Sequence, residues 1–249
     1  MKKIIAANWK MSGSKDIIKK YFNYFEKNIK NTSRNNIIIF PSYPHLAEVN
    51  SYKKINKSFE LGAQHCHHNN EVAQTSCVSA DMLSDIGCNF VLVGHSEWRS
   101  LNNQDNLSEI LESVIKNNMT PIFCIGESYS QKENSKTQSV IDNQLQNILD
   151  NKILFENCKI IIAYEPVWAI GTGTIPDINI IEFIHSYIKS KLAQKLSSAQ
   201  EKDIIVLYGG SVSTKNIKEI FSAKSVDGVL IGGASLDVEE FTKICNEKL

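Results

Sequence analysis

The sequence predicts a single α/β domain in which eight parallel strands close into a (β/α)8 barrel with the helices outside. Short apolar runs alternate with amphipathic stretches along the whole chain, a pattern typical of a parallel sheet covered by helices. Eight such pairs fit within the 249 residues, which is the usual size of a closed barrel. No linker or low-complexity segment interrupts them, so we expect one domain over residues 1–249. An open doubly wound sheet is the structural alternative.

The expected strands are short and mostly apolar, because a strand inside a parallel sheet is covered on both faces. Many of their residues are β-branched, which favours strand over helix in such short runs. In chain order, the predicted strands are residues 3–8, 37–40, 60–64, 90–93, 121–125, 160–164, 204–208 and 228–231.

The expected helices come from apolar residues that recur at helical spacing. Two helices, near residues 45–53 and 79–85, are expected to be short, and the last lies near residues 235–247. Three stripes are strong: Ile17, Ile18, Tyr21, Phe22, Phe25 and Ile29; then Leu107, Ile110, Leu111, Val114 and Ile115; then Ile180, Ile181, Ile184, Ile188 and Leu192.

Charge and cysteine usage exclude several classes of protein. The 27 basic and 27 acidic residues balance, and without a basic block nothing indicates nucleic acid. No apolar run has membrane-spanning length. After Met1 and the two lysines, the apolar run covers only residues 4–7, which is too short for a signal peptide. The six cysteines contain no CxxC pair, so we expect reduced thiols and a cytoplasmic protein.

The stretch over residues 160–174 carries the clearest functional signal. A buried strand ends at Glu165, which Pro166 pushes out of the helical region. Bulky residues including Trp168 follow, and then Gly171 and Gly173. Such a loop is able to swing as a lid and exclude water from a site. The alternative is a surface loop after a core strand, with Glu165 merely solvated.

Further polar residues stand directly after the other predicted strands. In a barrel these positions converge on one rim. Each has an ordinary structural interpretation by itself, such as a helix N-cap for Ser96 or a satisfied core histidine for His95. Together they place a cation, an imidazole, a carboxylate and two glycine-rich turns on one rim. They are Asn8, Trp9 and Lys10; Gly94, His95, Ser96 and Glu97; Cys124, Gly126 and Glu127; Glu165; Gly209, Gly210 and Ser211; and Gly232 and Gly233.

This set of residue types suits proton removal next to a carbonyl group. The glycine-rich loops after the last two strands open onto helices, so their backbone amides are able to face a phosphate. A carboxylate base then takes a carbon-bound proton, while a neutral imidazole and a lysine stabilise the enediolate oxygens.

Other chemistries fit less well. The two glycines of the lid stretch lack the third glycine of the dinucleotide-binding motif GxGxxG. A P-loop is excluded because it would need lysine where Ala234 stands. A glycosidase needs a second carboxylate, but Gly209 and Gly210 follow the seventh strand. No GxSxG elbow marks a serine triad. The cluster over residues 65–68 contains three histidines and a cysteine on one loop, which leaves metal binding there as a minor alternative.

At this point the rim motifs resemble those of the triosephosphate isomerase family, from one end of the chain to the other. The resemblance implies interconversion of dihydroxyacetone phosphate and D-glyceraldehyde 3-phosphate, a step of glycolysis and gluconeogenesis, with no cofactor and no metal. The motifs are Asn8-Trp9-Lys10, Gly94-His95-Ser96-Glu97, Tyr164-Glu165-Pro166-Val167-Trp168-Ala169-Ile170-Gly171-Thr172-Gly173, Tyr208-Gly209-Gly210-Ser211 and Gly232-Gly233-Ala234.

The same resemblance implies a role for each matching residue. Glu165 would be the base, His95 the neutral electrophile and Lys10 the cation. Ser96 would hold Glu165 at rest in the open enzyme. The remaining residues would bind substrate (Asn8, Gly171, Ser211, Gly232 and Gly233) or support the site (Glu97 and Cys124).

The resemblance also implies a homodimer, in which the segment 64–79 docks into a neighbouring copy and Thr75 reaches the partner's site. The sequence departs from the family here, with Ser76 and Cys77 where the family usually has Gly-Glu. Trp98 and Gln104 replace a common arginine–glutamate pair, and the stretch after Gly173 is shorter, with Thr174 in place of the common lysine.

Two further functions stay open on this fold. One is another aldose–ketose isomerase or an aldolase, which would need a Schiff-base lysine or a metal; Lys10 is the rim lysine. The other is a non-catalytic binding or scaffold protein, which would have no reason to combine a base, an imidazole and a lid.

Overall fold

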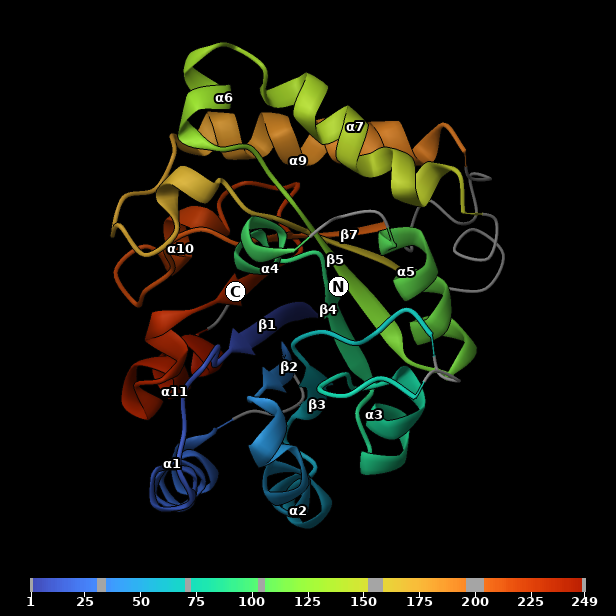
Figure 1. Cartoon of the computed structure of the whole chain (residues 1–249). Coiled ribbons are helices and arrows are strands. Elements are labelled where there is room, and N and C mark those ends of the chain that lie inside the picture. The colour runs from blue at the N-terminus through green and yellow to red at the C-terminus, as the bar shows by residue number, and fades with distance from the viewer. Residues whose placement is uncertain are drawn as a thin grey trace.

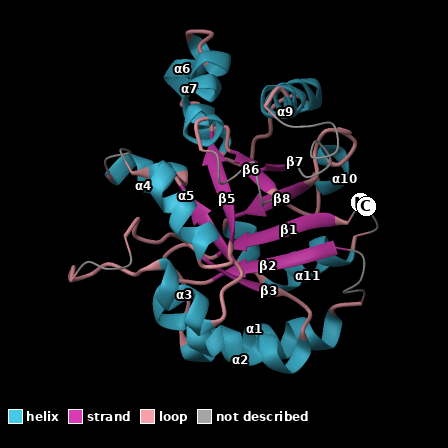
Figure 2. Ribbon diagram, turned by 90° about the vertical axis from the view of Figure 1, so that its right-hand side faces the viewer, coloured by secondary structure: helices cyan, strands magenta, loops and turns pink. Residues whose placement is uncertain are grey.

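The computed structural model describes residues 2–30, 35–69, 73–102, 106–151, 159–195 and 204–247. Its strands form a closed barrel in chain order, β1 to β8, and every neighbouring pair is parallel, including β8 with β1. Helices surround the strands on the outside (Figures 1 and 2). The structure therefore confirms the predicted (β/α)8 barrel and excludes the open sheet.

The strand bounds agree with the predicted runs to within two residues. The largest difference is at β2, which begins two residues early and pairs with the start of β1 through Asn35. The strands are β1 Lys3–Asn8, β2 Asn35–Phe40, β3 Glu60–Ala63, β4 Phe90–Val93, β5 Thr120–Ile125, β6 Ile160–Tyr164, β7 Ile204–Tyr208 and β8 Gly228–Ile231.

The helices vary much more in length than the strands do. The α-helices are α1 Lys15–Asn28, α2 Leu46–Asn56, α3 Ala80–Ile86, α4 Ser96–Leu101, α5 Leu107–Lys116, α6 Tyr129–Glu133, α7 Thr137–Leu149, α9 Ile178–Ala193, α10 Ile217–Ile220 and α11 Val238–Asn246. Short 3-10 turns precede or follow some of them: η1 Tyr43–His45, η2 Val167–Ala169 and η4 Gly233–Ser235.

Alternate residues of most strands build two separate cores. In β1, Ile5 and Ala7 belong to the large core between strands and helices, whereas Ile4 and Ala6 belong to the smaller core inside the barrel. This alternation follows from the two-residue period of a strand. The filled interior leaves the rim at the carboxyl ends of the strands as the place for a site.

Two details of the helices differ from the sequence expectation. Ile17 and Ile180, expected on buried stripes, are 54% and 47% exposed. The last helix begins at Val238 and not at residue 235, because Asp237 accepts hydrogen bonds from the backbone N–H groups of Glu239 and Glu240. A side chain that satisfies these first amides fixes the start of the helix.

His185 on α9 is fully buried, with its ring edge-on to Tyr164 at 5.9 Å between centroids. Burial, aided by the Lys189 charge, lowers the pKa of His185 to about 3. The unfolded chain therefore binds a proton near pH 6.5 that the folded protein takes up only near pH 3. The free energy of unfolding should fall as the pH is lowered through this window, by up to about 1.4 kcal/mol per pH unit.

A His185→Gln variant tests this expectation, since it removes the titrating group from both states. Urea unfolding at pH 7 and pH 5 should show a smaller loss of stability in the variant than in the parent. Burial also lowers the pKa of His65, to about 4. The stability of the variant should therefore still fall somewhat between pH 7 and pH 5. Equal slopes in the two proteins would contradict the assignment.

Candidate functional site

Glu165 directly follows β6 and is 2% exposed. Its backbone N–H donates to Ile125 O at 2.7 Å, which ties it to the end of the neighbouring strand β5. Gly209 leaves room for the side chain, since a Cβ there would lie 2.9 Å from Glu165 Cγ. The carboxylate is thus held at the inner rim of the barrel, as the sequence predicts.

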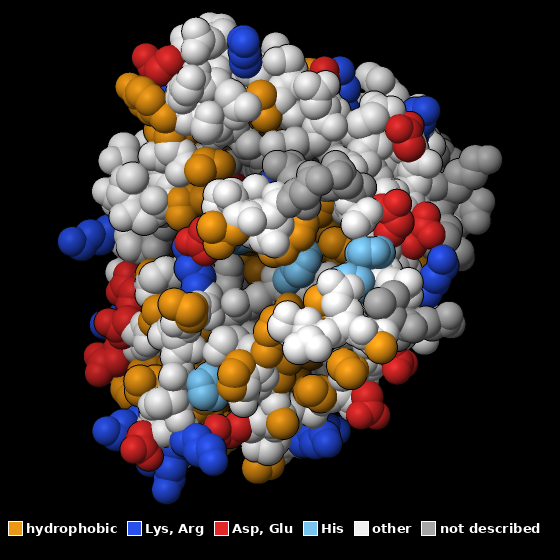
Figure 3. All heavy atoms as spheres, viewed as in Figure 1, with side chains coloured by type: hydrophobic (Ala, Val, Ile, Leu, Met, Phe, Trp, Pro, Cys, Tyr) orange, Lys and Arg blue, Asp and Glu red, His pale blue; other side chains and the backbone are white. Residues whose placement is uncertain are grey.

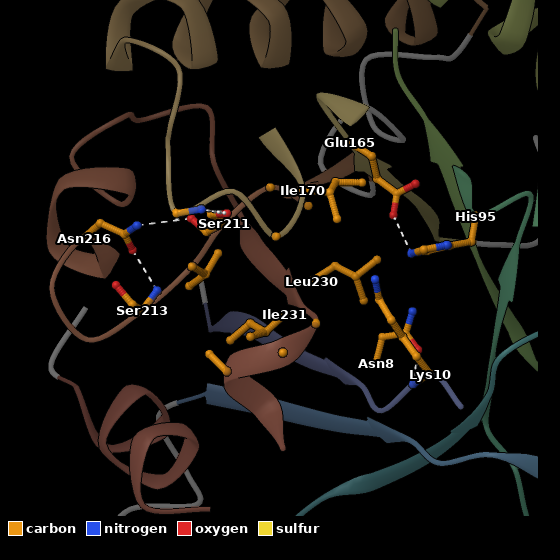
Figure 4. Close-up of a pocket in the computed structure, with 18 residues that line it drawn as sticks. Asn8, Lys10, His95, Glu165, Ile170, Ser211, Ser213, Asn216, Leu230 and Ile231 are labelled. Carbon is orange, nitrogen blue, oxygen red and sulfur yellow. Dashed lines mark hydrogen bonds and ion pairs between the residues drawn. The ribbon is translucent and has the colours of Figure 1, made fainter. Parts of the chain in front are cut away.

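His95 faces this carboxylate. Its Nε2 lies 3.0 Å from Glu165 Oε1, and the backbone N–H of Ser96 donates to Glu165 Oε2 at 3.0 Å (Figure 4). The other ring nitrogen, Nδ1, accepts the backbone N–H of Glu97 at 3.2 Å. An Nδ1 that accepts a hydrogen bond leaves the proton on Nε2, so the imidazole points a donor at the rim.

Opposing effects act on the His95 imidazole. Burial lowers the pKa of His95, but the Glu165 carboxylate and, more weakly, Glu97 raise it, so that it lies above its ordinary value in this arrangement. The increase depends on the Glu165 contact, the largest of the raising causes. If that carboxylate turns away, burial should dominate and favour the neutral ring.

Lys10 lies below His95 in Figure 4, in the loop after β1. It has a positive φ of 53°, a strained conformation for a side-chain-bearing residue. Asn8 Oδ1 accepts the Lys10 backbone N–H at 3.0 Å, and Gln64 Nε2 donates to Lys10 O at 2.8 Å. The ammonium contacts Glu97 Oε1 at 2.5 Å. These contacts hold Lys10 at the rim in spite of the strain.

The loop after Glu165 is anchored at its start by Glu127. Trp168 Nε1 donates to Glu127 Oε1 at 2.8 Å, and the Tyr164 hydroxyl donates to the same carboxylate. Glu127 is 1% exposed, and burial raises the pKa of its carboxyl despite these hydrogen bonds. Lys132 Nζ covers the indole face at 3.9 Å from the ring centroid, a cation–π contact.

The other end of this loop is held by Ser211. The Gly173 N–H donates to Ser211 Oγ at 3.1 Å, and the Ser211 hydroxyl donates to Ala169 O at 2.8 Å. Gly171 and Gly173 both have positive φ, 70° and 77°, which glycine adopts without steric cost. The predicted lid stretch therefore lies across the rim, with contacts at both ends.

A cavity of about 280 Å³ lies between Glu165, His95, Lys10 and Ser211. Figure 4 shows Glu165 and His95 on one side, Lys10 and Asn8 below them, and Ser211 across the cavity. The predicted Gly171, Gly232 and Gly233 also line it. A Cβ at Gly232 would press Lys10 Cε at 3.3 Å, so this glycine also makes room for the lysine. The lining residues that were not predicted as part of the site are Val212, Ser213, Asn216, Leu230 and Ile231.

Ser96, Glu97 and Cys124, which were expected to support the site, also lie close to this cluster. Ser96 and Glu97 contribute the backbone N–H groups described above. Cys124 is fully buried in the core inside the barrel. Burial, with the nearby Glu165 charge adding to it, raises the pKa of its thiol well above the usual range.

Beside Lys10 is a second cavity of about 580 Å³, lined in part by His95, Glu97, Trp98 and the predicted docking segment 64–79. Thr75 is exposed on that segment. Ser76, where the family usually has glycine, has a positive φ of 71°. Trp98 packs on His65, with ring centroids 4.4 Å apart, and Gln104 lies outside the described residues.

Metal binding at residues 65–68 finds no support in the described part of the chain. There, no three His, Cys, Asp or Glu side chains are grouped so that they could hold a metal ion. His65 is stacked on Trp98, and the rings of His67 and His68 lie 4.1 Å apart.

No helix within the described ranges is long and apolar enough to cross a bilayer.

The barrel and the position of its cavity first define a class, the (β/α)8 enzymes that act at the carboxyl ends of their strands. Comparison with known proteins is more specific. The model of the family described as triosephosphate isomerase matches residues 3–248. A triosephosphate isomerase of Francisella tularensis subsp. mediasiatica is 41% identical over 99% of this chain and 97% of its own. That of Colwellia psychrerythraea is 36% identical over 98% of this chain and 96% of its own.

Identity at this level, over nearly the full length of both chains, places this protein in the triosephosphate isomerase family. It is therefore an isomerase built on the barrel that the family shares, as the sequence motifs predict.

Proposed function

We propose that this protein interconverts dihydroxyacetone phosphate and D-glyceraldehyde 3-phosphate through an enediolate, as a step of glycolysis and gluconeogenesis. The observation that supports it best is the convergence of Glu165, His95 and Lys10 on one cavity whose far wall is glycine-rich backbone. A base, a donor and a cation beside an anion-binding wall suit a small phosphorylated carbonyl compound. The residues need no cofactor or metal for this chemistry.

Glu165 is the base in this mechanism. It rests on the Ser96 N–H and on His95, and has to turn toward the carbon of a bound substrate to remove its proton. The same carboxyl then returns the proton to the neighbouring carbon, and once the hydroxyl proton has passed from one enediolate oxygen to the other, the ketose has become the aldose. The Cys124 thiol, neutral because its pKa is raised, packs behind the base without adding charge.

His95 and Lys10 stabilise the enediolate oxygens. The His95 Nε2–H donor is fixed because Nδ1 accepts from Glu97, and the ring becomes neutral once Glu165 leaves it. Lys10 supplies positive charge, and Glu97 positions its ammonium. A preorganised donor and cation aimed at developing negative charge cost little reorganisation during the reaction.

The phosphate binds at the glycine-rich wall, with Asn8 contacting the reacting end of the substrate. Backbone amides of Gly232 and Gly233 at the start of η4, with Gly171 and Ser211, form the grip. A Cβ on Gly171 or Gly233 would meet no atom within 4 Å, so there is free space beside these residues. The lid over residues 166–174 then closes the site and excludes water.

A coupled isomerase assay with each triose phosphate tests the function. The purified protein should convert both substrates without added metal, also in the presence of a chelator. A requirement for metal, or cleavage of a larger sugar phosphate in place of isomerisation, would favour the aldolase alternative. Absence of any turnover would favour the binding-protein alternative.

We also propose that the protein is a cytoplasmic homodimer that docks through the segment 64–79. The described cysteines are all free thiols, as expected in a reducing compartment. Met11, Leu101 and Met82 are 99%, 85% and 57% exposed. Figure 3 shows hydrophobic side chains gathered around the place of α3. A neighbour's segment carrying Thr75 would fill the 580 Å³ cavity beside Lys10.

Cys77 on the docking segment should make this dimer sensitive to thiol reagents. It is partly exposed, whereas Cys66, Cys88, Cys124 and Cys245 are buried, and burial raises the pKa of Cys66 and Cys88 to about 12. Added bulk in a packed contact costs roughly 1–3 kcal/mol. Treatment with a methylthiolating reagent should dissociate the dimer and lower activity, since Thr75 supports the partner's Lys10.

Sedimentation and activity, measured together, check this expectation in the parent and in Cys77→Ser. Cys77→Ser should stay dimeric and keep its activity in the presence of the reagent. If Cys77→Ser is dissociated and inactivated as fast as the parent, Cys77 is not responsible.

A further inference from the structure

The loop between β7 and α10 forms the wall of the active-site cavity that lies across from Glu165. Ser211, Ser213 and Asn216 of this loop all line the cavity. Asn216 is joined to both of the others: its Nδ2 donates to Ser211 O at 3.1 Å, and its Oδ1 accepts the Ser213 N–H at 2.8 Å (Figure 4). One side-chain amide thus closes the loop on itself.

This arrangement is not the one expected from the position of Asn216 in the chain. Asn216 is the N-cap residue of α10, where an asparagine side chain ordinarily accepts from the first helical amides. Here it makes no such capping hydrogen bond. Its amide group is instead turned to the loop, where the donor and the acceptor each meet a partner of the opposite kind.

Asn216 is also connected to the lid stretch, because Ser211 contacts both. The carbonyl of Ser211 accepts from Asn216, while the Ser211 hydroxyl contacts Ala169 O and the Gly173 N–H. The loop is also held from outside the cavity. The Glu240 carboxylate accepts the Thr214 N–H at 2.7 Å and the Thr214 hydroxyl at 3.1 Å, and Glu240 does not line the cavity.

We propose that Asn216 is the positioning residue for the substrate's phosphate: its neutral amide fixes the Ser211–Ser213 turn that the phosphate contacts. This inference rests on the proposed function and deepens it. Asn216 takes no part in proton transfer, since the reacting groups Glu165, His95 and Lys10 lie on the other side of the cavity. Its removal should weaken phosphate binding and leave the chemistry nearly intact.

The isosteric change Asn216→Asp gives the sharpest test. It keeps the acceptor for the Ser213 N–H but replaces the donor to Ser211 O by a carboxylate oxygen, so two acceptors face each other. It also adds negative charge to the wall that receives a phosphate. We expect KM for dihydroxyacetone phosphate to rise about 10- to 100-fold, as for loss of a part-buried hydrogen-bond partner combined with an added negative charge, with kcat changed less than about threefold.

Two further readouts separate positioning from general damage. The inhibition constant of inorganic phosphate should rise in parallel with KM, whereas kcat/KM for unphosphorylated D-glyceraldehyde should stay unchanged. Asn216→Leu, which loses both hydrogen bonds without adding charge, should show the same selectivity with a smaller increase in KM. Glu240→Gln is the matched control on the same loop, and its KM should stay within about twofold of the parent.

Several results would overturn the assignment: an unchanged KM in Asn216→Asp, an equal loss with D-glyceraldehyde, or an equal effect of Glu240→Gln. The proposed function itself fails separately, if the parent shows no isomerase activity. In that case calorimetry with inorganic phosphate on the parent and on Asn216→Asp still decides whether Asn216 shapes an anion site.

Discussion

Replacing Glu165 with aspartate is expected to lower kcat by on the order of 100-fold while KM changes little. The substitution keeps the charge but withdraws the carboxylate by about the length of a methylene, and a misplacement of that size can cost about 10²-fold. The backbone cannot follow the shorter side chain, because the Glu165 N–H is bonded to Ile125 O and Gly126 packs against its carbonyl.

Steady-state kinetics in both directions measure this effect. Glu133→Asp is a matched control, since Glu133 is an exposed carboxylate on α6 and should tolerate the same change. Removing the His95 donor by substitution with alanine should cost a similar ~10²- to 10³-fold. A kcat close to that of the parent in Glu165→Asp would remove Glu165 from the role of base.

The barrel was predictable because strand and helix periods differ strongly along this chain. The β-branched runs at β6 and β7 are apolar at every position and fully buried, so neither face has a polar residue to obscure the signal. Ile17 and Ile180 fit the apolar spacing of their helices but lie outside the buried faces. Apolar spacing locates the buried face of a helix. The width of that face depends on how closely the neighbouring helices approach, and the periodicity of one helix carries no information about its neighbours.

The chemical groups of the site were predictable from their positions after strands, because every parallel strand ends at the same rim. The contacts that hold them were not. Glu127 was placed on the rim without a role, and nothing in the sequence pairs it with Trp168. Asn216 was not among the predicted site residues, and only the folded loop shows that its amide contacts the cavity wall. Such contacts depend on loop conformation.

The second large effect is expected from shortening the lid. An enediolate phosphate exposed to water can expel its phosphate group, which gives methylglyoxal and inorganic phosphate after tautomerisation. In the intact protein, the proposed lid over residues 166–174 contacts Glu127 near one end and Ser211 near the other. Deleting residues 169–172 should open the site, lower isomerisation by several orders of magnitude and make methylglyoxal a major product.

A milder substitution tests whether this effect comes from the lid stretch. Lys132→Met removes the cation that covers the Trp168 ring at 3.9 Å but leaves the lid length unchanged. A cation–π contact is worth roughly 0.5–2 kcal/mol, so the lid conformation in which Trp168 contacts Glu127 should be less populated, and the methylglyoxal fraction should lie between those of the parent and the deletion. Both products are measured in one reaction, by coupled assay for the aldose and by derivatisation for methylglyoxal. A product ratio that is the same in all three proteins would show that the segment does not act as a lid.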